Sequence, residues 1–240
     1  MKSFRVPSTA LLLWALTAGW LAAEPVAPEP GQILDSYLAA WRAQQDRLPG
    51  STAAVSIQAE MPRLRRSGRL SALRRISRLG RVTYDILRFE GDNSIKNQVI
   101  ARYLSAETQV RESADASLSV TPDNYKFSYK GWRELDGRGV YVFELKPRKK
   151  RMGLFRGTLW IDRLTYLPVR EAGRLVKNPS IFIKKVQFTR DYEQRGGLAV
   201  VSRLESTVET RLAGPARIAV QYADYRFAPA AEGGIASESH

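Results

Sequence analysis

Between positions 125 and 227 the sequence is an almost unbroken succession of stretches in which apolar and polar residues alternate. Tyr125, Phe127 and Tyr129 alternate with lysines and a serine, and an Asp-Gly hairpin signal at 136–137 precedes the next stretch. Consecutive strands joined by short turns form antiparallel meanders. A large antiparallel sheet has to curl, close or be covered, because a flat open sheet leaves its apolar face in water.

Two stripes of apolar residues at helical spacing supply the cover. They predict a helix over 32–47, which either packs on the sheet or acts as a lid, and a second over 94–107, after a turn and helix-start signal at 91–93. The expected fold class is α+β, mostly antiparallel β: a curved half-open β-barrel of about ten strands, with its two helices covering the concave face. The predicted strands are 53–57, 67–77, 81–89, 125–130, 140–145, 157–162, 167–174, 181–192, 203–212 and 217–227.

The first residues indicate export. Lys2 and Arg5 precede an apolar stretch over 9–23, a pattern typical of a secretory signal, with cleavage expected after Ala23 and an uncleaved inner-membrane anchor as the alternative. A Pro-rich linker is expected over 24–31, the folded domain over 32–227 and a disordered tail over 228–240. The expected location is therefore the periplasm.

Composition removes most catalytic chemistry from consideration. The chain of 240 residues has no Cys, and its single His is the last residue, His240, so thiol nucleophiles, Cys-ligated zinc and His-based triads are excluded. We expect no metal, no cofactor and no enzymatic activity. A carboxylate pair or a Ser–Lys dyad would be needed for catalysis, and the acids that we single out, Asp162 and Glu144, are better interpreted as strand-end residues.

The charge is strongly positive, with 38 Lys and Arg against 24 Asp and Glu and a net charge of +14. No nucleic-acid-binding motif is visible in the sequence, so we expect no nucleic-acid partner. Outside the cytosol the abundant anions are lipid headgroups, lipopolysaccharide and cell-wall polymers. One basic cluster falls in an expected hairpin loop, where it either contacts an anionic membrane surface or an acidic protein partner, or simply keeps the surface solvated: Lys146, Arg148, Lys149, Lys150 and Arg151.

Several motifs resemble a known family. GTLWIDRLTYLPVR at 157–170, VQFTRDY at 186–192 and YVFELKPRKK at 141–150 resemble the strands and turns of the periplasmic outer-membrane lipoprotein-sorting proteins (LolA/LolB-like), as does Asn124-Tyr125 followed by Phe127. The resemblance covers roughly residues 32–227. It implies an incomplete β-barrel with helices plugging an apolar cavity, and binding of the acyl chains of lipids or lipoproteins.

The expected function is thus a periplasmic carrier that holds acyl chains in an apolar cavity during envelope transport. The alternative is an envelope sensor or interaction domain on the same fold, without carrier activity. A cavity needs apolar residues facing inward, and each candidate could equally be an ordinary core residue. The lipid-binding candidates are Val55, Ile57, Val82, Tyr84, Ile86, Phe127, Tyr129 and Trp160.

Overall fold

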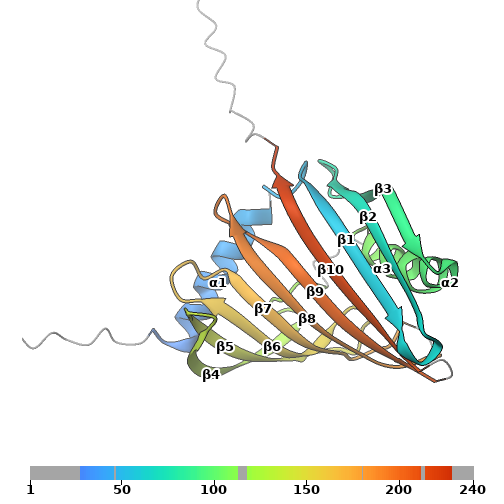
Figure 1. Cartoon of the computed structure of the whole chain (residues 1–240). Helices are drawn as coiled ribbons and strands as arrows, with labels where there is room; N and C mark the ends of the chain where they lie inside the picture. The colour runs from blue at the N-terminus through green and yellow to red at the C-terminus, as the bar shows by residue number, and fades with distance from the viewer. Residues whose placement is uncertain (1–27, 46, 113–117, 180, 212–213, 229–240) are drawn as a thin grey trace, which may run out of the picture.

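The computed structural model describes residues 28–45, 47–112, 118–179, 181–211 and 214–228, and there it has one antiparallel sheet of ten strands (Figure 1). The strand order is β3-β2-β1-β10-β9-β8-β7-β6-β5-β4, so β1 pairs with β10 and the sheet's two edges are β3 and β4. This confirms the predicted fold class. The strands are β1 (Thr52–Met61), β2 (Arg66–Ile76), β3 (Val82–Gly91), β4 (Tyr125–Leu135), β5 (Arg138–Pro147), β6 (Phe155–Asp162), β7 (Pro168–Leu175), β8 (Ile183–Arg195), β9 (Leu198–Thr210) and β10 (Pro215–Arg226).

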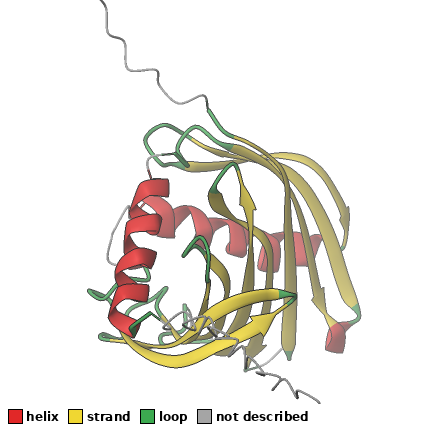
Figure 2. Ribbon diagram, turned by 90° about the vertical axis from the view of Figure 1, so that its left-hand side faces the viewer, coloured by secondary structure: helices red, strands yellow, loops and turns green. Residues whose placement is uncertain are grey.

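Both predicted helices are present, and they lie on the inner side of the curved sheet (Figure 2). The first is α1 (Pro30–Gln45). The second is a continuous helical run in which a π-helical segment joins two α-helical parts. A separate short 3-10 turn follows β1. The Asp92 side chain caps the second run by accepting a hydrogen bond from Ser94 N at 2.7 Å. These elements are η1 (Pro62–Leu64), α2 (Asn93–Ile95), η2 (Lys96–Ile100) and α3 (Ala101–Glu112).

A pair of glycines lets the backbones of β6 and β7 approach each other closely. Gly157 and Gly173 are register partners, and the two backbones approach so closely that a Cβ on Gly157 would lie 1.9 Å from the carbonyl oxygen of Ala172. A Cβ on Gly173 would likewise lie 2.4 Å from the carbonyl oxygen of Arg156. Only glycine fits such an approach of two strands.

Each half of the inner face carries its own apolar cluster under its own helix. The first cluster joins β1, β2, β9 and β10 to the second helical run through Ile95, Val99 and Ile100. The second joins β4, β5 and β6 to α1 through Ile33 and Tyr37. The strand faces and helix faces that the sequence predicts to be apolar are therefore the buried ones, and one helix covers each apolar cluster.

The predicted signal peptide lies wholly outside the described residues, as do positions 24–27 of the linker and positions 229–240 of the tail. Within the part of the chain that is described, no helix combines the length and apolar content needed to cross a membrane.

Candidate functional site on the inner face

An apolar strip on β7, β8 and β9 lies between the two clusters. Val186 and Val208 are register partners, and Phe188 faces Gly173. The ring of Phe188 packs edge-on against Phe155 at a centroid distance of 5.0 Å, and Phe188 touches both clusters. These side chains are half-buried, unlike the cluster cores. We define the inner strip as Leu175, Val186, Phe188 and Val208.

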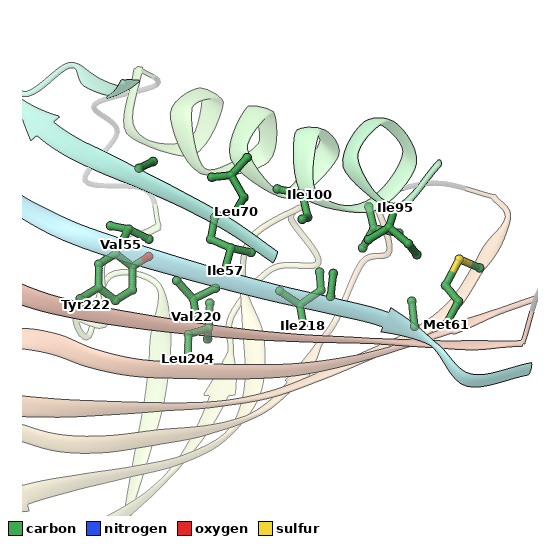
Figure 3. Packing of buried hydrophobic residues seen from close by; sticks show 14 residues of the cluster. Val55, Ile57, Met61, Leu70, Ile95, Ile100, Leu204, Ile218, Val220 and Tyr222 are labelled. Carbon is green, nitrogen blue, oxygen red and sulfur yellow. The ribbon is translucent and has the colours of Figure 1, made fainter. Parts of the chain in front are cut away.

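The candidates from the first half of the chain fall in or near the first cluster (Figure 3). Val55 and Ile57 are buried in it beside α2, η2 and α3, and Val82 is buried at the start of β3. Tyr84 is half-buried on the same face. Ile86 has the inward phase that the sequence predicts, but it is exposed, because β3 is an edge strand with an extra residue, Leu87, in its ladder.

The candidates from the second half divide between the two faces. Phe127 and Tyr129 are half-buried against the second cluster, where both pack on the ring of Phe143. Trp160, in contrast, lies on the outer face, so its assignment to an inward cavity is corrected. Its neighbours Leu159 and Ile161 are fully buried on the inner face, which leaves the outer face for Trp160 because successive side chains alternate. There it lines a hollow of about 380 Å³ with Lys130, Arg133, Val142, Glu144 and Thr158.

A carboxylate on the inner side of α3 gathers polar groups from three strands. Glu107 Oε1 accepts a hydrogen bond from Arg74 Nε at 3.1 Å, and Oε2 accepts from the hydroxyls of Tyr103 at 3.2 Å and Tyr222 at 3.4 Å, and also from that of Tyr84. Burial, followed by the charge of Glu107, raises the pKa of Tyr222 to about 12. Burial disfavours the charged form of Arg74, but Glu107 together with Tyr84, Tyr222 and Tyr225 outweighs burial and raises the pKa of that guanidinium. We call Glu107 and its four hydrogen-bond donors the Glu107 cluster.

A second ionic group lies at the end of the inner strip just beyond Phe188 on β8. Arg190 Nη1 donates to Glu171 Oε2 at 2.9 Å and lies 3.5 Å from the hydroxyl of Tyr192. Its guanidinium carbon lies 5.6 Å from the centre of the Phe188 ring. Burial opposes the charge on Arg190, yet Tyr192 and Glu171 outweigh burial and raise its pKa. The inner face therefore changes from apolar to ionic along β8, within the two residues from Phe188 to Arg190.

Sequence reasoning missed both ionic groups. Glu107, Glu171 and Arg190 look like surface charges, because Lys, Arg, Asp and Glu are seldom buried unless paired. The signal that could have found Glu171 is its phase: it lies two residues before Gly173 and opposite the inward Leu159.

A groove of about 1210 Å³ lies on the outer face, across the strand ends from β3 to β6. The side chains that reach it are mostly polar or charged, including Gln58, Arg69, Arg156, Arg174 and Glu205. This groove is therefore unsuited to an acyl chain, and apolar ligand binding has to rest on the inner strip.

The two acids that we singled out for catalysis have structural partners. Asp162 Oδ1 accepts hydrogen bonds from the backbone amides of Leu164 and Thr165, each at 2.9 Å, and so organises the β6–β7 turn. Glu144 lies between Lys130 and Lys146 on the outer face, and the hydrogen bonds from these lysines lower the pKa of its carboxyl group. Within the described part of the chain, no group of three or more acidic side chains is placed to hold a metal ion.

The basic cluster lies where the sequence predicts, at the end of β5 and in the β5–β6 loop, and all five side chains are exposed. Lys146 Nζ pairs with Glu144 Oε1 at 3.2 Å. Arg148 Nε donates to the carbonyl oxygen of Pro122 at 2.6 Å. For Lys149, Lys150 and Arg151, no ion pair with another described residue is present.

Comparison with known proteins gives structural likenesses at low sequence identity. Neither a protein-family model nor a curated protein matches the sequence. A DUF1329 family protein from Desulfovibrio piger is 12% identical, with a TM-score of 0.47 over 82% of this chain and 92% of that one. A domain assigned to outer membrane lipoprotein sorting from Vibrio parahaemolyticus is 15% identical, with a TM-score of 0.43 over 83% and 94%. A LolA superfamily protein from Nitrosomonas europaea is 14% identical, with a TM-score of 0.39 over 85% and 96%.

Proposed function

We propose that this protein is a periplasmic binding protein that carries acyl chains of lipids or lipoproteins on its inner strip. The observation that carries the proposal is the half-buried apolar strip between two helix-covered clusters, on the concave side of an open sheet. An apolar stretch that is only half-buried offers an apolar ligand a surface to cover.

The apolar inner face of β8 matches the length of one acyl chain. It starts at Ile183, which pairs with Thr210, and continues through Val186 and Phe188 of the inner strip, so the strand rises about 16 Å from Ile183 to Phe188, at roughly 3.3 Å per residue. The acyl chains of one leaflet span about 15 Å, half of a hydrocarbon core of roughly 30 Å. A dozen methylenes removed from water give about 10 kcal/mol gross, and a bilayer offers nearly the same environment. Transfer between membrane and strip is then close to neutral, which suits a carrier.

We propose binding rather than catalysis. The roles of Asp162 in a turn and of Glu144 between two lysines support this, because neither carboxylate faces the inner strip. Export of the chain, as its first residues predict, would bring the strip to the compartment where lipids and lipoproteins cross between membranes.

The test places a charge on the strip. The variant Val186→Asp/Val208→Asp introduces two carboxylates at paired positions on the inner face. The control Gln187→Asp/Thr207→Asp introduces two carboxylates at the adjacent paired positions on the outer face. Bound ligand would bury the new charges, so we expect at least a hundredfold weaker binding of a fluorescent fatty acid by the inner variant and less than a twofold change in the control. Equal binding by both variants, with both folded by circular dichroism, would refute the proposal.

A second candidate function, an interaction domain that binds a protein partner, is favoured by one observation. Edge strand β3 exposes Ile86 and Leu87 beside an unpaired ladder, a surface to which another chain can add a strand. Movement of acyl cargo between vesicles by the delipidated protein would favour the carrier. Retention of a protein partner without such movement would favour the interaction domain.

A further inference from the structure

One end of the sheet presents a ring of neighbouring loops. Because the strands are antiparallel, the loop after β1, the loop between β5 and β6, the loop between β7 and β8, and the turn between β9 and β10 all lie at this end, together with the segment before β4. β1 ends there, at the lower right of Figure 1. We call the described residues of these segments the rim: 62–65, 118–124, 148–154, 176–179, 181–182, 211 and 214.

Contacts join the rim segments at one side of this end. Gly214 lies against Arg63, since a Cβ at position 214 would come within 2.2 Å of the Arg63 Cδ atom. Arg211 connects the β9–β10 turn to the β7–β8 loop: its Nε donates to the carbonyl oxygen of Ile181 at 2.8 Å, and its backbone amide donates to that of Phe182 at 2.9 Å.

Hydrogen bonds also join the rim segments between the β7–β8 loop and the segment before β4. The backbone amide of Val176 donates to the carbonyl oxygen of Leu154 at 3.0 Å, which joins the β7–β8 loop to the β5–β6 loop. Arg148 in the β5–β6 loop reaches the carbonyl oxygen of Pro122 in the segment before β4. The rim is therefore one surface built from loops distant in sequence.

Large apolar side chains project from this surface. Ile181 is 80% exposed, Phe182 58%, Met152 54% and Leu64 47%. The two on the β7–β8 loop sit on a backbone fixed by Arg211, and Asn178 Nδ2 further holds that loop by donating to the carbonyl oxygens of Ile183 and Lys184. Their exposure thus belongs to an ordered loop, and water is an unfavourable environment for them.

The rim is strongly positive. The rim segments contain a single acidic residue, Asp123. The basic residues in the same segments are Arg63, Arg65, Arg148, Lys149, Lys150, Arg151, Lys177 and Arg211.

On the outer face next to the rim, like charges also oppose each other across strands. Lys126 faces Lys146 between β4 and β5, and Arg156 faces Arg174 between β6 and β7. Such pairs destabilise a sheet. Among the described residues, no carboxylate forms an ion pair with Lys126, Arg156 or Arg174. A bound anionic surface would relieve this repulsion.

We propose that the rim docks on an anionic phospholipid bilayer, with its apolar tips entering the headgroup region and its basic residues contacting the lipid phosphates. Apolar side chains flanked by Lys and Arg are the combination that a bilayer interface recognises. This goes beyond acyl-chain carriage and does not depend on it, because docking uses the rim loops and carriage uses the inner strip.

The test is co-sedimentation of the full chain with vesicles of phosphatidylglycerol and phosphatidylcholine. Lys149→Glu/Lys150→Glu is compared with Arg78→Glu/Arg138→Glu, which makes the same charge change at the opposite end of the sheet. Each basic residue near an anionic surface contributes about fivefold in affinity, so we expect at least a 25-fold loss at low salt for the rim variant. The control should change less than about threefold, and pure phosphatidylcholine should bind the wild-type chain weakly.

The apolar part has its own matched pair. Ile181→Ser/Phe182→Ser should weaken binding at low and at high salt, whereas Leu79→Ser/Leu164→Ser, which removes two exposed leucines at the opposite end, should not. Equal losses in rim and control variants would overturn the proposal in favour of a general net-charge effect. Absence of vesicle binding by the wild-type chain would overturn it in favour of an acidic protein partner. Unchanged fatty-acid binding by the rim variants keeps this result separate from the test of the inner strip.

Discussion

Replacing Glu107 by Gln should loosen the helical cover of the first cluster. Glu107 lies on α3, while the groups that donate to it lie on β2, β3, β10 and α3 itself, so its carboxylate ties the helix to three strands. The Gln side chain keeps an oxygen acceptor and nearly the same volume. What the change removes is the negative charge.

The cost follows from the burial of the ion pair. The Arg74 side chain is 6% exposed and that of Glu107 is 19% exposed, with Nε and Oε1 3.1 Å apart. Removing one member of a buried pair costs about 3–5 kcal/mol, because the other charge stays buried without its partner. Since Glu107 retains some contact with water, we expect Glu107→Gln to cost about 3 kcal/mol. Arg74→Met should cost less, because three tyrosine hydroxyls still donate to Glu107.

A double-mutant cycle measured by urea unfolding isolates the interaction. The variant Arg74→Met/Glu107→Gln should be more stable than the sum of the single changes predicts, by at least ~1.5 kcal/mol. Hydrogen exchange should show the amides of α3 opening first in Glu107→Gln. Additivity within about 0.5 kcal/mol would show that the ion pair does not hold α3 on the sheet.

Two further outcomes follow from the geometry. Gly157→Ala should lower the free energy of unfolding by about 3 kcal/mol or more, because its Cβ would overlap the carbonyl oxygen of Ala172. The control Gly137→Ala lies in a turn with open space around it and should cost only the strain of its positive φ. Equal shifts in the thermal unfolding temperature of the two variants would contradict this reasoning. The folded-state pKa of Tyr222, about 12, lies above the ordinary value of 10.0, so this tyrosine contributes stability that is present below pH 10 and lost as the pH rises toward 12. Urea unfolding between pH 8 and pH 11.5 should show a smaller decline for Tyr222→Phe than for the wild-type chain, and an identical decline would contradict the assignment.

The strands and helices could be predicted because each is encoded locally. The alternation of β4 and β9 fixes one buried face, and the apolar stripes of the two helices fix another. Trp160 shows where local information ends. It stands between two apolar residues, Leu159 and Ile161, so the sequence there has no alternation, and the inward phase is set only by pairing with β5 and β7.

The charged groups of the inner face could not be predicted for a related reason. Glu171 and Arg190 become partners only through the β7–β8 register, and Glu107 acquires its donors only when α3 crosses the first half of the sheet. A buried charge is recognised by its partner, and a single sequence does not show partners distant in the chain. The basic loop needed no such partner, which is why its position and exposure agree with the sequence.

The inner strip and the rim meet, and this gives the two proposals a common geometry. Leu175 ends β7, Val186 lies near the start of β8 and Val208 near the end of β9, so the apolar strip begins beside the rim loops. Further along β8 the strip stops at an ion pair between the buried Glu171 and Arg190, whose side chain is 37% exposed, and these charges would reject an apolar chain. An acyl chain could therefore enter from the rim and would be limited at the far end by charge. A carrier that docks by its rim would present the open end of its binding strip to the bilayer that supplies or receives the chain.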